Sequence, residues 1–259
     1  MFTDFLETLQ SHHLSPSQWA LVILSAVILG VSKGGISAIS ILTVTLLAHV
    51  FGGRTSTGVL LPMLIVADVF AVAWFRRHTQ WRHLLRMLPW MLVGVVLGAW
   101  LGGDLNEAVF KKIMAFIILL SVGVLLWREY RHSEKVPRHW SFAGAMGLGA
   151  GFTTMVGNLA GGFSNVYFLS MRLPKAQFIG TGAWLFCVVN LFKLPFHLFL
   201  WKTISADSLA LNATLLPFLL AGFALGVYIV RNIPEARYRS LILWLTASSV
   251  LLVAVDLSF

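Results

Sequence analysis

Three charged residues lie within stretches of sequence that are otherwise apolar, and they are the first candidates for chemistry. Lys33 and Lys193 are basic, and Asp68 is acidic. A charge inside a membrane-spanning segment is costly and indicates a functional site by default. Two positive charges and one negative charge around one cavity would favour a small anion. The alternative for Lys33 is that it extends to a membrane surface or pairs with a carboxylate.

The first of these charges lies at an interruption of an apolar run, the sequence Ser32-Lys33-Gly34-Gly35. Glycine weakens a helix, and a lysine at this depth needs polar surroundings. A helix that starts after the interruption would also direct its backbone N–H groups towards an anion. We therefore predict that Lys33, Gly34 and Gly35 bind an anion.

A second interruption covers residues 153–158 and ends at Asn158. Asn158, Gly161, Gly162 and Asn165 have the spacing i, i+3, i+4 and i+7, which predicts one face of a single helix. Asparagine amides are neutral hydrogen-bond donors. For Asn158, anion binding and helix packing are equally supported. For Asn165 and the glycines, close helix packing is the simpler interpretation.

Asn190, Lys193 and His197 have the spacing i, i+3 and i+7 and form a polar stripe on an otherwise apolar helix. Lys193 lies too far from the helix end to extend easily to the surface. We predict that Asn190 and Lys193 bind the anion. His197 and Asp68 are candidates for coupling transport to proton movement; an interfacial position for His197 and a structural pairing of Asp68 with a lysine are the alternatives.

The composition predicts that most of the chain lies in or beside a membrane. Of 259 residues, 58% are hydrophobic and 11% are charged, and the mean hydropathy is +0.83. The net charge of +9 comes from 19 Lys and Arg residues, which cluster between apolar runs as in cytoplasmic loops, and this does not favour nucleic-acid binding.

No known catalytic or metal-binding motif stands out. The single cysteine, Cys187, excludes an intrachain disulfide and a cysteine-based zinc site. No nucleophile motif, phosphate-binding loop or metal-ligand spacing is present. We expect neither enzymatic activity nor a metal or cofactor.

Six apolar runs have the length of a membrane-spanning helix, which needs about 20 residues. They cover residues 56–75, 84–103, 109–127, 177–200, 212–230 and 238–255. Two further stretches, residues 17–51 and 140–171, are too long for one crossing and contain the two interruptions. We predict that each forms a hairpin of two short helices, although two complete short crossings would fit as well.

The order of one hairpin and three spans occurs twice, and glycine and proline positions keep the register. Adding 122 carries Gly35 to Gly157, Gly58 to Gly180 and Asp68 to Asn190. Adding 128 carries Pro89 to Pro217, Gly94 to Gly222 and Gly98 to Gly226. The sequence therefore predicts an all-α integral membrane protein with two repeats. Residues 1–259 would form one membrane domain with repeats at about 17–127 and 140–255 and a cytoplasmic linker at 128–139.

The distribution of basic residues predicts that the two repeats are inverted relative to each other. In that arrangement the inside holds Arg76, Arg77, Arg82, Arg86, Arg128, Arg131, Lys135, Arg138, Arg172, Lys175, Arg231, Arg237 and Arg239. The outside holds Arg54, Lys111, Lys112 and Lys202. Parallel repeats would divide these charges almost equally, against the positive-inside tendency. Both termini would then face outward.

Four groups of residues form recognisable motifs: Leu29 to Gly35, Leu60 to Pro62 with Ala67 and Asp68, Trp74 to His78, and Leu88-Pro89 with Gly94 and Gly98. In these residues the sequence resembles the sulfite exporter TauE/SafE family of membrane transporters. The resemblance covers about residues 17–255 and is weaker in the second half. Many members have a longer glycine run at the first interruption, followed by a proline, whereas this chain has Lys33 in the run and Thr43-Val44 beyond it.

The resemblance implies a transporter of sulfite, sulfonates or related organic anions in the bacterial cytoplasmic (inner) membrane. Its partners would be the small anion and membrane lipids. A passive anion channel is the first alternative, and a membrane scaffold subunit is the second. The anion flux through a channel would not saturate with anion concentration. A scaffold would keep its function after the loss of Lys33, Lys193 and Asp68 together.

Overall fold

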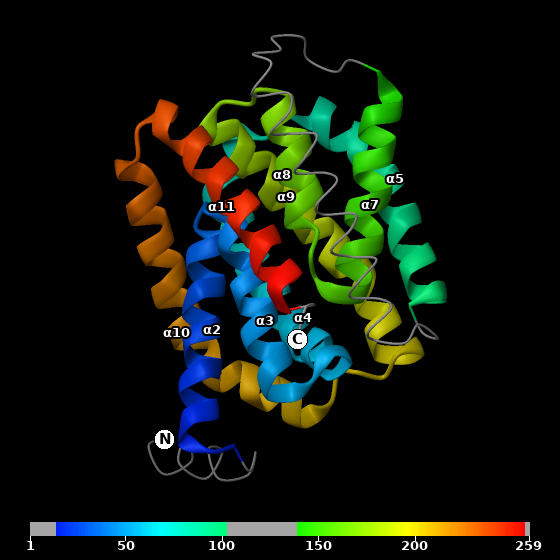
Figure 1. Cartoon of the computed structure of the whole chain (residues 1–259), viewed down its shortest axis with the longest axis vertical. Coiled ribbons are helices and arrows are strands. Elements are labelled where there is room, and N and C mark those ends of the chain that lie inside the picture. Colours follow the sequence, from blue (N-terminus) through cyan, green and yellow to red (C-terminus); the bar gives the residue numbers. More distant parts are fainter. Residues whose placement is uncertain (1–13, 103–138, 257–259) are drawn as a thin grey trace.

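The computed structural model describes residues 14–102 and 139–256, and this part of the chain contains helices and turns but no β-strand (Figure 1). The predicted all-α class is therefore confirmed. The elements are α2 (Pro16–Lys33), η1 (Ser37–Ile39), α3 (Ser40–Phe51), α4 (Gly53–Phe75), η2 (Arg76–His78), α5 (Trp81–Leu101), α7 (Trp140–Gly157), α8 (Gly161–Ser170), α9 (Lys175–Pro195), η3 (Phe196–Leu200), α10 (Ala206–Asn232) and α11 (Glu235–Asp256).

Five of the six predicted spans lie in this part of the chain and form α4, α5, α9, α10 and α11. The predicted span at 109–127 lies outside the described residues. In the described part of the chain, five helices are long and apolar enough to cross a membrane: α2, α5, α10, and α4 and α9 together with the turns that extend them. The chain is thus a multi-pass membrane protein.

Both long stretches are interrupted at the predicted positions, which are the glycines after Lys33 and the segment that ends at Asn158. In each stretch the chain then turns back on itself. The Thr43 hydroxyl on α3 donates to the Ser25 carbonyl on α2 over 3.3 Å, so α3 returns along α2. On the second hairpin, a side chain at Gly149 of α7 would meet the Phe163 ring of α8 at 2.6 Å. The first arm is longer than predicted, because the 18 residues of α2 extend about 27 Å and suffice for a crossing.

Local sequence explains where these hairpins begin and end. Ser15 and Gln18 form a capping box at the start of α2, with Pro16 in the first turn. Gly35 takes a positive φ of 130° after α2, and Asn158 takes a left-handed φ of 56° after α7. Both conformations end a helix, and they suit glycine and asparagine.

The hairpin of each half packs on a helix of the other half through glycines. At Gly34, which caps the C-terminal end of α2, a side chain would lie 2.7 Å from the Gly226 Cα of α10. In α5, Gly94 contacts α7, where a side chain would lie 3.0 Å from the Gly151 Cα. Van der Waals packing of small residues is a main source of helix association in membranes.

Corresponding helices of the two halves run in opposite directions. Figure 1 shows α2 rising from the end that carries the N-terminus, whereas α7 descends from the opposite end. The close approach of Gly180 in α9 to the Phe75 carbonyl at the end of α4 places the start of α9 beside the end of α4. This geometry is compatible with inverted repeats, although the third span of the first half lies outside the described residues.

Basic side chains gather at one end of the described structure, which we call the basic end. At this end, the Lys175 ammonium on α9 donates to the carbonyls of Val230 and Ile233 on α10 over 3.0 and 2.7 Å. The described residues here are Arg76, Arg77, Arg82, Arg86, Arg172, Lys175, Arg231, Arg237 and Arg239. At the opposite end, Arg54 donates to the Gly102 carbonyl and lies over the Trp201 ring, near Lys202.

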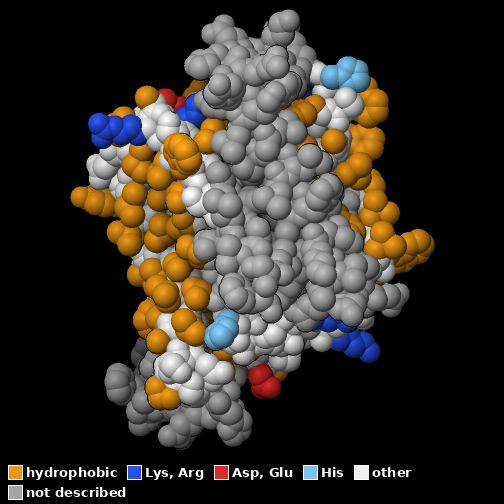
Figure 2. All heavy atoms as spheres, in the orientation of Figure 1, with side chains coloured by type: hydrophobic (Ala, Val, Ile, Leu, Met, Phe, Trp, Pro, Cys, Tyr) orange, Lys and Arg blue, Asp and Glu red, His pale blue; other side chains and the backbone are white. Residues whose placement is uncertain are grey.

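Figure 2 shows hydrophobic side chains along both flanks of the molecule, with Lys and Arg near its ends. This division agrees with the predicted inside and outside groups, as far as the structure describes them. Which end faces the cytoplasm stays a prediction.

Candidate functional site

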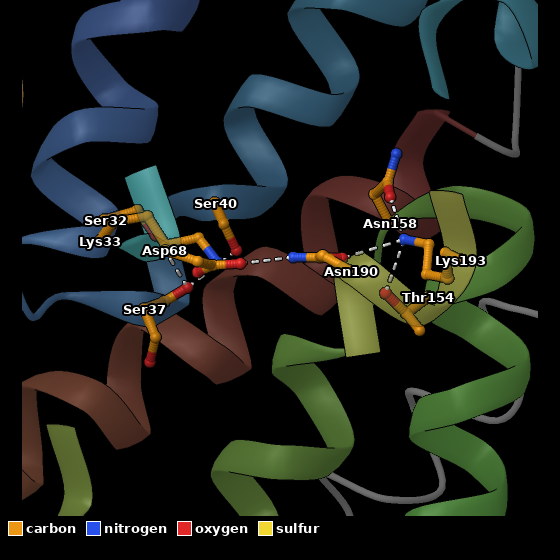
Figure 3. Close-up of polar contacts among 9 residues, drawn as sticks. All are labelled: Ser32, Lys33, Ser37, Ser40, Asp68, Thr154, Asn158, Asn190 and Lys193. Carbon is orange, nitrogen blue, oxygen red and sulfur yellow. Dashed lines mark hydrogen bonds and ion pairs between the residues drawn. The ribbon is translucent and has the colours of Figure 1, made fainter. Parts of the chain in front are cut away.

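A continuous chain of polar side chains crosses the middle of the protein between the two halves (Figure 3). It begins with Lys33 at the end of α2, whose ammonium lies 2.5 Å from Asp68 Oδ1 on α4. The other carboxylate oxygen of Asp68 accepts a hydrogen bond of 2.6 Å from the Asn190 amide on α9. Asp68 is fully buried, and both of its oxygens have a donor. Of the two roles predicted for Asp68, the structure shows the pairing with a lysine, and that lysine is Lys33.

The second part of this chain surrounds Lys193, which lies one helical turn beyond Asn190. Its ammonium donates to Asn158 Oδ1 over 2.5 Å and to Asn190 Oδ1 and Thr154 Oγ1 over 3.2 Å each. Lys193 is fully buried. All three acceptors are neutral oxygens, so within residues 14–102 and 139–256 no carboxylate contacts this ammonium directly.

The two asparagine amides have a defined orientation within this chain. The Asn190 amide nitrogen points to Asp68, and its oxygen points to Lys193. The Asn158 nitrogen donates to the Thr57 carbonyl on α4 over 3.3 Å, so its oxygen also faces Lys193. Neither amide can be reversed without placing its nitrogen against an ammonium.

A cavity lies beside this chain, between the two helix breaks. Its volume is about 60 Å³ for the centres of water-sized molecules, which is room for a few waters or a small anion. Its polar lining consists of Ser32, Lys33, Ser37, Ser40, Thr154, Asn158, Asn165, Asn190 and Tyr238. Its apolar lining includes Leu64, Ala71, Phe178, Ile179, Ala183 and Phe186. The Lys33 ammonium lies 4.8 Å from the centre of the Phe186 ring.

Polar contacts from α8 and α11 support the cavity wall at the first break. The Ser37 hydroxyl donates to Asn165 Oδ1 over 2.8 Å, and the Asn165 nitrogen donates to Thr246 on α11 over 3.2 Å. The Tyr238 hydroxyl on α11 donates to the Gly35 carbonyl over 2.7 Å. Asn165 therefore has the structural role that the sequence favoured, although it also lines the cavity.

The prediction that Asn158 and Asn165 share one helix face is wrong. α7 ends at Gly157 and α8 begins at Gly161, because Asn158 adopts the left-handed conformation and turns the chain. Both asparagines still reach the same cavity, from different helices. The helix start expected directly after Lys33 also lies further on, because η1 intervenes before α3 starts at Ser40.

The remaining predicted site residues divide into two groups. Gly35 lines the cavity, whereas Gly34 packs against α10 and is absent from the lining. His197 lies in the π-helical turn η3, is fully buried, and its Nδ1 is 2.8 Å from the Thr203 hydroxyl. His197 lies outside the lining of the cavity, one turn beyond Lys193.

The sequence did not single out Ser37, Ser40, Thr154 or Tyr238 as site residues. A signal existed for three of them. Ser37 and Ser40 have helical spacing just after the first break, and Thr154 lies one turn before Asn158. Tyr238 had no such signal, because only packing of α11 brings it to the first break. The described residues contain no group of three metal-ligating side chains.

Comparisons with known proteins give two matches. The family model described as "Sulfite exporter TauE/SafE" matches residues 22–253. "Probable inner membrane transporter protein TsaS" of Comamonas testosteroni is 27% identical over 186 residues, which cover 70% of this chain and 73% of the relative. No solved structure matches.

Proposed function

Because the chain belongs to the sulfite exporter TauE/SafE family, we propose that it transports sulfite, a sulfonate or a related small organic anion, and that it binds this anion in the cavity between the two helix breaks. The family is one of membrane transporters, and the spanning helices agree with this. One observation carries the assignment of the site: a hydrogen-bonded chain of buried charges joins both halves beside the cavity.

The proposed binding groups follow from what borders the cavity. Lys33 is the cation that faces it, and its side chain is 10% exposed. Asn158, Asn190 and Gly35 line the same cavity, and hydroxyl groups could complete the shell around an oxyanion. The apolar lining on the other side would accept the short carbon chain of an organic anion.

The membrane is proposed from the relative in Comamonas testosteroni, whose name places it in the inner membrane. The five helices of the described residues that are long and apolar enough to cross a membrane support a multi-pass location. We therefore propose the bacterial inner membrane for this chain.

The proposal extends to proton coupling at Asp68. Asp68 shares Lys33 with the cavity, so an anion bound at Lys33 acts electrostatically on this carboxylate. The other ionisable groups near Asp68 are Lys193 and Cys187 of α9. On α10, Phe223 packs in an apolar cluster with Ala71, which lies one turn beyond Asp68 on α4. His197 is a second coupling residue by this proposal, because it is buried one turn from Lys193.

Thermal unfolding of the purified protein tests the binding site, because a ligand that binds only the folded state stabilises it. Sulfite, thiosulfate, sulfonates and carboxylates form the panel. We expect at least one of these anions to raise the melting temperature of the natural protein. The double variant Lys33→Met with Asp68→Asn should lose this rise; it removes the ion pair without leaving a buried charge unpaired. The matched control is Lys202→Met with Asp207→Asn. It changes exposed residues at the end of the molecule opposite the basic end.

Uptake into proteoliposomes separates the transporter from the alternatives. A transporter shows saturable flux that the double variant abolishes. Flux without saturation would indicate a channel, and stabilisation without flux would favour a scaffold.

Proton coupling is tested with Asp68→Asn in the same proteoliposomes. This variant should keep anion binding, but a pH gradient should no longer accelerate its anion transport. A normal response of Asp68→Asn to the gradient would contradict coupling at Asp68.

A further inference from the structure

The charge of the binding site follows from the hydrogen bonds of its three ionisable residues (Figure 3). Asp68 accepts from Lys33 at one oxygen and from Asn190 at the other. A carboxyl group that accepts at both oxygens, one of them from an ammonium, is in its ionised form. Asp68 and Lys33 together therefore contribute no net charge.

The Lys193 amine is surrounded by acceptors. Both asparagine oxygens are turned towards it by the contacts of their nitrogens with Asp68 and Thr57, and Thr154 Oγ1 is the third acceptor. Three oxygen atoms match the three N–H groups of an ammonium. With Lys193 in this charged form, all three of its donors are used by neutral oxygens.

These charges leave the site with one unbalanced positive charge. Among the described residues, the Lys, Arg, Asp and Glu side chains other than these three lie towards the two ends of the molecule. Lys193 does not line the cavity, but Asn158, Asn190 and Thr154, which hold it, do. An anion in the cavity is thus separated from Lys193 by a single layer of polar groups, in surroundings where charges are weakly screened.

We propose that the site selects monoanions over dianions, because one negative charge neutralises it and a second does not. This inference rests on the proposed function and specifies the charge of its substrate. With a monoanion bound, the buried charges sum to zero, which is the cheapest state in a low-dielectric interior. With a dianion bound, the site carries a net negative charge. Protonation of Asp68 would balance that charge, so a dianion requires a proton that a monoanion does not.

In this arrangement Lys193 is a positioning residue. It holds the oxygens of Asn158 and Asn190, which leaves the nitrogen of Asn190 on Asp68 and that of Asn158 on Thr57. The ion that contacts the substrate is Lys33, and the positive charge that the substrate balances is that of Lys193.

Calorimetric titration of the purified protein with ethanesulfonate and ethane-1,2-disulfonate tests the proposal. The probes have the same carbon chain and charged group, and they carry one and two negative charges. We expect the natural protein to bind the monosulfonate at least about tenfold more tightly. In Asp68→Asn the site charge rises by one, so the ratio of the two affinities should move about tenfold or more towards the disulfonate.

The ratio is compared between proteins, so the different size of the two probes cancels. Asp207→Asn, which removes an exposed carboxylate at the start of α10, should keep the natural ratio. Lys193→Gln keeps a hydrogen-bonding group but removes the charge. It should weaken the binding of both probes. An unchanged ratio in Asp68→Asn would overturn the charge assignment while leaving the anion site intact. Binding of neither probe, nor of any other anion, by the natural protein would overturn the proposed function itself.

Discussion

The two halves of the protein share a helical frame but differ in the charges that they place at the middle of the molecule. In both halves a broken hairpin packs through glycines on a helix of the opposite half. At the corresponding positions 68 and 190, however, one half carries a carboxylate and the other a carboxamide, and these two side chains bond to each other. The first half pairs its lysine with the carboxylate. The second half surrounds its lysine with neutral oxygens.

This difference separates the residues that pack the helices from the residues of the proposed binding site. Glycines that allow close contact recur in both halves, because either hairpin must approach its partner helix. The charged residues do not recur: adding 122 carries Lys33 to Met155, and Lys193 corresponds to Ala71. The two helical halves are therefore alike in packing and unlike in charge, and the proposed anion site depends on the part that is unlike.

The comparison of the two halves depends first on their opposite orientation in the membrane. Thiol labelling of single cysteines tests this orientation and gives the largest expected effect. Single cysteines replace the exposed residues Arg77, Asn232 and Lys202 in a Cys187→Ser background. In intact cells, an impermeant thiol reagent should modify Lys202→Cys and leave Arg77→Cys and Asn232→Cys almost unmodified. Permeabilised cells provide the control, because all three should then react. Modification of Asn232→Cys with protection of Arg77→Cys in intact cells would support parallel halves.

The loss of stability on replacing Lys33 should depend on Asp68, whereas the loss on replacing Lys193 should not. Lys33→Met leaves a buried carboxylate without its cation and should destabilise the protein by about 3 to 5 kcal/mol. Adding Asp68→Asn should recover about 1 to 3 kcal/mol, because the two residues are in direct contact. Lys193→Met should show little recovery with Asp68→Asn, since its partners are neutral oxygens. Unfolding in detergent measures each variant, and equal recovery for both lysines would contradict the difference between the halves.

The glycines at the two breaks should tolerate alanine differently. At Gly34 a methyl group would lie 2.7 Å from backbone atoms of α10, including the Gly226 Cα, and Gly34→Ala should cost about 1 to 3 kcal/mol through overpacking. At Gly161 the nearest atom would be the Ser40 hydroxyl at 3.5 Å. Gly161→Ala should therefore fold normally but weaken anion binding, because its methyl group enters the cavity. Melting temperature and anion titration separate the two effects, and a stable Gly34→Ala protein would show that α10 moves away easily.

The smallest expected change in stability concerns the hydrogen bond by which Tyr238 of the second half holds the first break. Tyr238→Phe removes the donor to the Gly35 carbonyl and should cost about 1 kcal/mol. Tyr228→Phe is the matched control, because Tyr228 is exposed on α10 and should show no change in melting temperature. Equal stability of both variants would indicate that the Gly35 carbonyl finds another donor.

Much of the frame could be predicted from the sequence, because it depends on local properties. Apolar runs of sufficient length predicted α4, α5, α9, α10 and α11 to within a few residues, except at the start of α10, where α10 begins six residues earlier. The glycines after Lys33 and the segment ending at Asn158 predicted both breaks, since Gly35 and Asn158 adopt conformations that end a helix. A polar residue within an apolar run is also visible in the local sequence, so Lys33, Asp68, Asn190 and Lys193 could be selected as a group.

The sequence alone could not assign the partners within that group. Whether Asp68 pairs with Lys33 or Lys193 depends on how α2, α4 and α9 are rotated and spaced, and this is set by packing between helices that are distant in sequence. The same packing brings Tyr238 of α11 to Gly35 and places Asn158 and Asn165 on different helices around one cavity. Residue types and spacing determined which charges enter the membrane, whereas only the tertiary structure decided which of them is balanced.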